Sequence, residues 1–91
     1  MTGTFNSVWD ALESSPEDAE KMKLRSVFMI ALSDYVKNSG GTQATVAERL
    51  GISQPRLSDL LKGKINKFSL DMLVTLAIKA GLTIDLNVRA A

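Results

Sequence analysis

A sharp break between two short helical segments constrains this chain more than any other feature. It lies in residues 42–64, TQATVAERLGISQPRLSDLLKGK. The pattern predicts one helix over residues 43–50, ended by Gly51, and a second over residues 54–62, capped by Ser53. An isolated helix needs roughly 12 to 15 residues to be even marginally stable in water. Both segments must therefore be held by neighbouring parts of the fold.

The spacing of small and apolar residues indicates how the two segments hold each other. Ala47 offers a small side chain where two helix axes approach, and Gly51 can adopt the positive φ of a tight turn. Ile52 can fill the corner, while Leu57 and Leu60 point from the second helix into the core. This arrangement predicts a helix-turn-helix, in which the first helix braces the second so that the second can enter a groove.

The opposite face of the second segment is polar. Its residues are Gln54, Pro55, Arg56, Ser58, Asp59 and Lys62. One interpretation is a face that reads nucleic acid; the other is a set of ordinary solvent-exposed residues in a module that binds another protein. Arg56 and Asp59 stand three residues apart, so we expect them to pair with each other on the helix surface.

The formal net charge of +1 conceals an uneven distribution of charge. Residues 1–41 hold four basic and six acidic residues, whereas residues 42–91 hold seven basic and four acidic ones. Within residues 53–67, four basic residues accompany one acidic residue, which suits a polyanion met by one face of the protein. The alternative is a solvated loop that happens to contain lysines.

Two further helical patterns precede this region. In FNSVWDALE, the apolar residues share one helix face, which can dock on the protein's own core or in a partner's groove; they are Phe5, Val8, Trp9 and Leu12. Ser15, Pro16 and Asp18 then form a helix start signal, and nothing breaks a helix before about Asn38. Its apolar stripe comprises Leu24, Phe28, Ala31, Leu32 and Tyr35, widened by Val27, Ile30 and Val36. A stripe this broad predicts a central core helix rather than a binding surface.

The end of the chain changes period. After a helix predicted over residues 70–80, the residues Leu82, Ile84, Leu86 and Val88 alternate with polar ones, which predicts a half-buried strand. No second strand is evident elsewhere in the sequence, and a lone strand leaves its backbone groups unpaired. We therefore expect the strand to pair with a second copy of the chain. The expected dimerisation residues are Thr83, Ile84, Asp85, Leu86, Asn87 and Val88.

Composition excludes several kinds of protein. The chain has no Cys, so it offers no disulfide and no thiolate metal site, and it has no His, the commonest metal ligand and the commonest general base. We expect no enzyme activity, no metal and no cofactor. No apolar run approaches the roughly 20 residues that span a bilayer, so we expect no membrane association. We expect the protein to lie in the bacterial cytoplasm and, as a regulator, to associate with the nucleoid. A chain of 91 residues has a thin margin of stability, and a partner subunit would supplement it.

The stretch from residue 21 to about residue 80 resembles the Cro/repressor-type helix-turn-helix family, also called the xenobiotic-response-element (XRE) type. The resemblance rests on Gln43, Ala47, Gly51 to Gln54, Leu57, Ser58, Leu60 and Gly63. The whole chain is also similar to HigA-type antitoxins and their orphan relatives, through the run from Ser53 to Lys64, the phrase KFSLDML and the C-terminal strand pattern.

The resemblance implies a fold and a set of domains. The expected fold is all-α and lambda-repressor-like, a compact bundle of about five helices with a C-terminal β-strand paired across a dimer. We divide the chain into an N-terminal amphipathic segment (1–14), a helix-turn-helix DNA-binding domain (15–81), and a C-terminal strand and tail (82–91).

The resemblance also implies roles for individual residues. Gln43 would contact a phosphate, Gln54 and Arg56 would read base edges, and Ser58 would reach a base or a phosphate. Lys62, Lys64 and Lys67 would neutralise phosphates. Ser53 and Pro55 complete the expected DNA-binding set, although Pro55 can offer only its ring.

Two functions follow from this resemblance. The first is a sequence-specific regulator of transcription, a homodimeric repressor that binds a pseudo-palindromic site in its own promoter. The alternative is the antitoxin of a HigBA-like pair, which would also neutralise a small basic toxin ribonuclease. Its contact would be the apolar face of the N-terminal segment or the acidic start of the long helix.

Overall fold

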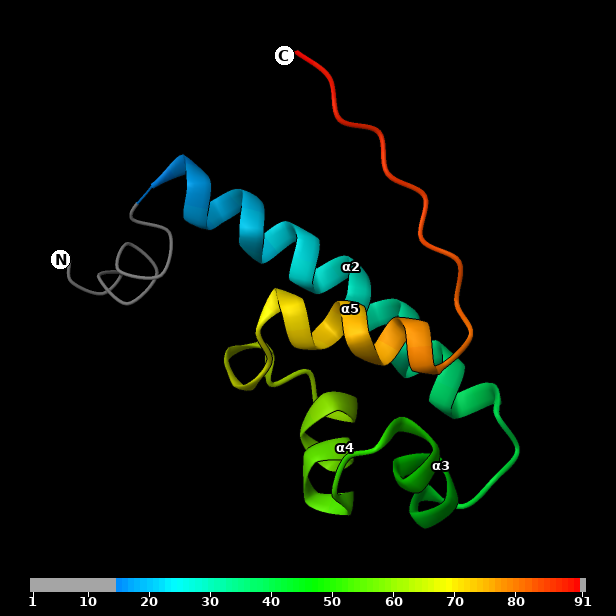
Figure 1. Ribbon diagram of the computed structural model, residues 1–91. Coiled ribbons are helices and arrows are strands. Elements are labelled where there is room, and N and C mark those ends of the chain that lie inside the picture. Colours follow the sequence, from blue (N-terminus) through cyan, green and yellow to red (C-terminus); the bar gives the residue numbers. More distant parts are fainter. Residues whose placement is uncertain (1–14, 91) are drawn as a thin grey trace, which may run out of the picture.

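The computed structural model describes residues 15–90, and their elements are all helical. In chain order they are α2 (Pro16–Asn38), α3 (Gln43–Leu50), α4 (Gln54–Leu61), the short 3-10 helix η1 (Ile65–Lys67) and α5 (Leu70–Lys79). In Figure 1, α2 and α5 lie alongside each other, α3 and α4 lie together below them, and the last residues rise away from the end of α5. No helix in this part of the chain is long and apolar enough to cross a membrane.

Side-chain caps set where the helices begin. The hydroxyl of Ser15 accepts from the backbone N–H of Asp18, and Thr42 accepts from Thr45 in the same way. Ser53 and Ser69 cap α4 and α5 by the same contact. Because each cap satisfies a donor that the first turn leaves unpaired, the helix starts follow from local sequence.

Gly51 makes the break between α3 and α4. It ends α3 in the left-handed region, with φ 72 and ψ 30, and its N–H donates to the carbonyl of Glu48. The N–H of Ile52 donates to the carbonyl of Ala47 at 3.0 Å, which closes the turn. A side chain at this φ would be strained, so glycine allows α4 to start after only three intervening residues.

One apolar core joins all the elements. Its buried residues come from every α-helix and from the segment before α5: Met29, Leu32, Val36, Val46, Ala47, Leu50, Leu57, Leu60, Phe68, Leu73 and Leu76. A hydrogen bond from Arg49 to the hydroxyl of Tyr35, 2.9 Å long, also ties α3 to α2. The two short helices are thus held by tertiary contacts, as their length requires.

The predicted C-terminal strand is wrong for the described residues. Residues 82–90 form no strand. The described chain, residues 15–90, contains four α-helices, where a bundle of about five helices with a strand was predicted. Leu82 and Ile84 are partly buried, but Leu86 and Val88 are 74% and 91% exposed. Alternation describes which side chains could share a face, whereas a strand also needs a second backbone to bond, and the described residues supply none. The helix expected near the N-terminus lies outside the described residues.

The prediction that the whole broad apolar stripe of α2 belongs to the core is also wrong. Only Met29, Leu32 and Val36 of α2 are buried. Val27 and Ile30 are each 64% exposed, and Leu24 is 43% exposed. The apolar stripe is wider than the surface that α3, α4 and α5 can cover, so one side of α2 presents apolar groups to solvent.

Candidate nucleic-acid interface

The residues expected to form the core of the helix-turn-helix lie between its two helices. Ala47 is 2% exposed, and Leu57 and Leu60 are fully buried. Ile52 is half-buried against the core cluster, and Gly51 makes the turn. Since α4 also contacts α2, the orientation of α4 is fixed from two sides.

The leading end of α4 is left free by this packing. Ser53, Gln54 and Pro55 are exposed, and Ser58 one turn later is half-buried. Ser53 still holds the first turn, because its hydroxyl accepts from the N–H of Arg56 at 3.2 Å. The first turn is therefore both ordered and accessible, as a helix that enters a groove must be.

Further polar groups extend this surface. Gln43 is exposed at the first position of α3, directly after the capping Thr42. Lys62, Lys64 and Lys67 are exposed at or beyond the end of α4. Together with Ser53, Gln54, Pro55 and Ser58 we call this set the recognition surface.

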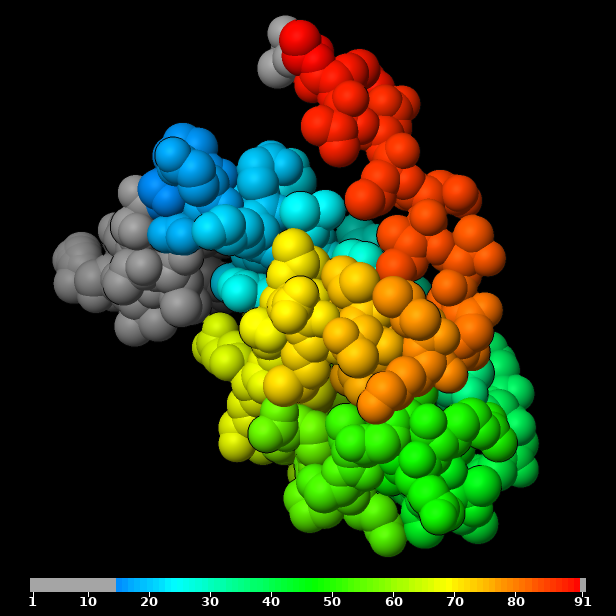
Figure 2. Space-filling view, in the orientation of Figure 1, coloured from blue at the N-terminus to red at the C-terminus, as the bar shows by residue number. Residues whose placement is uncertain are grey.

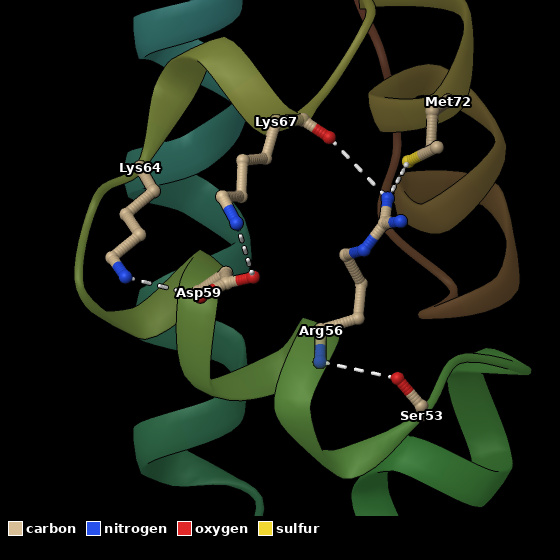
Figure 3. A network of polar contacts seen from close by, with 6 residues as sticks. All are labelled: Ser53, Arg56, Asp59, Lys64, Lys67 and Met72. Carbon is tan, nitrogen blue, oxygen red and sulfur yellow. Dashed lines mark hydrogen bonds and ion pairs between the residues drawn. The ribbon is translucent and has the colours of Figure 1, made fainter.

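The side chain of Arg56 points in a different direction from those of its neighbours in the first turn of α4. Its guanidinium Nη1 donates to the backbone carbonyl of Lys67 at 3.3 Å and approaches Sδ of Met72 at 3.4 Å (Figure 3). The guanidinium carbon also stands 5.6 Å from the ring centroid of Phe68, a cation–π distance. The charged end of Arg56 thus points toward η1 and α5.

Asp59 does not form the expected pair with Arg56. Its two carboxylate oxygens approach Nζ of Lys64 at 3.5 Å and Nζ of Lys67 at 3.8 Å (Figure 3). The i, i+3 spacing suggested a local partner, but the chain after α4 returns two lysines to the same carboxylate, while Arg56 finds a carbonyl and an aromatic ring. Partners that come from outside the helix cannot be predicted from the spacing of residues within it.

Lys79 and Phe68 were not among the residues predicted for the site. A β-carbon at Gly51 would meet Nζ of Lys79 at 2.8 Å, so the end of α5 lies directly over the turn of the motif. Phe68 is 2% exposed beneath Arg56. A signal was present only for Phe68, as the single aromatic residue in the segment that joins α4 to α5.

The expected dimerisation residues lie on another side of the molecule. Residues 82–86 form one wall of an apolar groove, and α2 and α5 form the other; its lining includes Leu24, Val27, Phe28, Ala31, Ala77 and Leu82 to Leu86. The last described residues extend away from the helices, as Figure 2 shows. Phe5, Val8, Trp9 and Leu12, the expected toxin contacts, lie outside the described residues.

Comparison with known proteins identifies the class. A family model described as a helix-turn-helix domain matches residues 11–89. One solved structure, provisionally named an XRE family transcriptional regulator, is 31% identical and superposes with a TM-score of 0.73. The match covers 81% of this chain and 83% of that one. No curated protein matches the chain.

The chain therefore belongs to the helix-turn-helix domain family. Within that class it is a regulator of the XRE type, as the sequence resemblance predicted.

Proposed function

We propose that this DNA-binding transcriptional regulator is a sequence-specific repressor that binds, as a homodimer, a pseudo-palindromic operator in its own promoter. The observation that carries the proposal is the leading end of α4. Gln54 and Pro55 are exposed there on a capped first turn, while Leu57 and Leu60 hold the same helix in the core. A rigid helix with a free polar end is what reading a major groove requires.

Base reading falls first to Gln54. Its side chain can pair with both the N6 donor and the N7 acceptor of adenine, a contact worth about 1–3 kcal/mol of discrimination against other bases. Pro55 can contact a thymine methyl group, and Ser58 can donate to a base or to a phosphate. These three residues lie within two turns of one helix, so they can address adjacent base pairs.

Phosphate contacts surround these readers. Gln43 lies at the start of α3, where free backbone N–H groups and the helix dipole favour an anion. Lys62, Lys64 and Lys67 extend the positive surface beyond the other end of α4. Each phosphate contact fixes register on the duplex and releases counterions, so affinity should fall steeply as salt rises.

The apolar groove between α2, α5 and residues 82–86 supports homodimerisation. Leu24 and Val27 of α2 are exposed beside a tail whose Leu86 and Val88 are more exposed still. An apolar surface of this extent on one side of a small protein is typical of an interface. A second copy bound there through side-chain packing would relate two α4 helices by a two-fold axis, and a pseudo-palindrome has the same symmetry.

The proposal is tested by footprinting the purified protein on the DNA upstream of its own reading frame. We expect protection of two half-sites about one helical turn apart, centred roughly 34 Å from each other. Gln54→Ala should reduce protection, whereas Lys23→Ala on the exposed side of α2 should leave it unchanged. Equal protection of unrelated DNA at physiological salt would contradict sequence-specific binding.

The antitoxin function remains a prediction from the sequence. The four apolar side chains expected to contact a toxin lie outside residues 15–90. The other expected contact, the acidic start of α2, is exposed at Glu17, Asp18 and Glu20. Co-expression with an adjacent short reading frame, followed by purification, would reveal a small basic protein bound to this chain if the prediction holds.

A further inference from the structure

The segment from Lys64 to Phe68 is the part of the recognition surface with the least regular structure. It contains the three residues of η1, and its backbone N–H groups make four hydrogen bonds to backbone carbonyls: Lys64 donates to Asp59, Ile65 to Gly63, Lys67 to Lys64 and Phe68 to Ile65. It nevertheless carries two of the lysines expected at the DNA backbone. What fixes this segment therefore determines where those two charges lie.

Arg56 holds the far end of the segment. Its guanidinium bonds the carbonyl of Lys67 and lies over the ring of the next residue, Phe68. It also contacts Met72 of α5, so it connects the start of α4 to both following elements. Arginine suits this task because its planar group can donate at its edge and stack on a ring with its face.

Asp59 holds the segment from the next turn of α4. Its carboxylate, 20% exposed, lies between Nζ of Lys64 and Nζ of Lys67. Figure 3 shows the two α4 side chains reaching the segment along separate routes, Arg56 to its backbone and Asp59 to its lysines. An acidic residue on a DNA-facing helix would repel phosphate, so a role within the protein accounts for its presence better than contact with DNA does.

We propose that Arg56 and Asp59 act as a two-point clamp that fastens residues 64–68 to α4. In this proposal, which rests on the proposed function of the chain in DNA binding, Arg56 is a positioning residue and does not read a base. The clamp presents Lys64 and Lys67 to the DNA backbone as a fixed pair beside the helix that reads the groove. Base reading is left to Gln54, Pro55 and Ser58.

The alternative for Arg56 is release of all these contacts on binding DNA, followed by a bidentate contact with guanine. Release would leave the carbonyl of Lys67 without its donor and remove the cation from Phe68, while also freeing the segment that carries two phosphate-binding lysines. The two roles predict different effects of the same substitution.

The first test measures base preference. Wild-type protein, Arg56→Met and Gln54→Ala are titrated against the operator and against each single-base-pair variant of it. A positioning role predicts that Arg56→Met weakens binding to every site by a common factor of about 5, the effect of one lost net hydrogen bond. Gln54→Ala, the matched control, should lose about 10-fold discrimination at one base pair. Loss of discrimination at a single base pair in Arg56→Met would overturn the proposal.

The second test needs no DNA and uses the full chain. Amide hydrogen exchange is measured for Lys67 and Phe68 and compared with Leu73 and Leu76 in α5, which report unfolding of the whole domain. Arg56→Met and Asp59→Asn should each accelerate exchange at Lys67 and Phe68 by about 10-fold relative to α5. Glu48→Gln, which removes an exposed charge from α3, should not.

Unchanged exchange at Lys67 and Phe68 in both variants would overturn the clamp even if the protein binds DNA as proposed. Conversely, accelerated exchange in a protein that fails to protect any operator would support the clamp while contradicting the proposed function. The two hypotheses therefore fail by different measurements.

Discussion

The recognition surface and the apolar side of α2 are both exposed, but they are built in opposite ways. On the recognition surface the residues that face outward are polar, while α4, which carries several of them, is held in the core by Leu57 and Leu60; Ser53 caps its first turn, and Asp59 pairs with two of the lysines beyond its end. On α2 and residues 82–88, the exposed residues are themselves apolar. The first surface is complete in one chain and suits a polar ligand, whereas the second is stabilised only if something apolar covers it.

The most severe test of this comparison truncates one leucine in the helix that carries the recognition surface and one leucine in the apolar tail. Leu57→Ala should lower the free energy of unfolding by about 2–5 kcal/mol, because Leu57 is fully buried between α4 and the core. Leu86→Ala should change it by less than about 0.5 kcal/mol, since the side chain is 74% exposed. Urea denaturation in dilute solution, below the concentration at which dimers form, measures both. Equal losses would show that the tail is part of the core.

The second prediction concerns assembly. Val27→Asp places a charge on the exposed apolar side of α2, where a second copy would have to bury it without a partner. We expect the dissociation constant of the dimer to rise by at least about 10-fold, with the fold intact by circular dichroism. Sedimentation equilibrium measures the constant. Ala44→Asp, on the exposed side of α3, is the matched control and should dimerise as the wild type does.

Two results of that experiment would contradict the assignment. A wild-type protein that remains monomeric at every concentration would remove the dimer itself. A dimer that is unaffected by Val27→Asp would place the interface on another surface and leave the apolar side of α2 unexplained.

The same contrast explains which features could be predicted from sequence. The helix starts at Ser15, Thr42, Ser53 and Ser69 depend on contacts within one turn, so sequence spacing is sufficient to find them. The left-handed turn at Gly51 is equally local.

The predictions that failed all depend on contacts with parts of the chain that are distant in sequence, or with a strand that the described residues do not contain. Helical periodicity locates the apolar stripe of α2 but does not say how much of it the other helices cover. Alternation in residues 82–88 gives a possible strand face but not a second strand to bond. The direction of Arg56 depends on Lys67, Phe68 and Met72, which the fold brings to it from 11 to 16 residues away.

The third prediction compares two helix caps of the same kind. Ser53→Ala and Ser69→Ala each remove a hydroxyl that accepts from an N–H three residues on, at 3.2 and 3.1 Å, so each should cost about 1 kcal/mol of stability. Only Ser53 lies in the recognition surface, and only Ser53→Ala should weaken operator binding, by about 3-fold. Fluorescence anisotropy under conditions where both variants are folded separates the effects. Equal weakening by Ser69→Ala would mean that binding reports overall stability.

The smallest expected effect is a change in salt dependence. Lys62 is exposed at the end of α4, and if it meets a phosphate, Lys62→Ala should reduce the slope of log affinity against log salt by about 0.9. Lys23 is a cation of the same kind on α2, 72% exposed and paired with Glu20 at 3.0 Å, so Lys23→Ala should leave the slope unchanged. Because both substitutions remove one positive charge, a general effect of net charge would change both slopes equally. A difference confined to Lys62 would identify a specific contact, since counterions are released only where a cation meets the duplex.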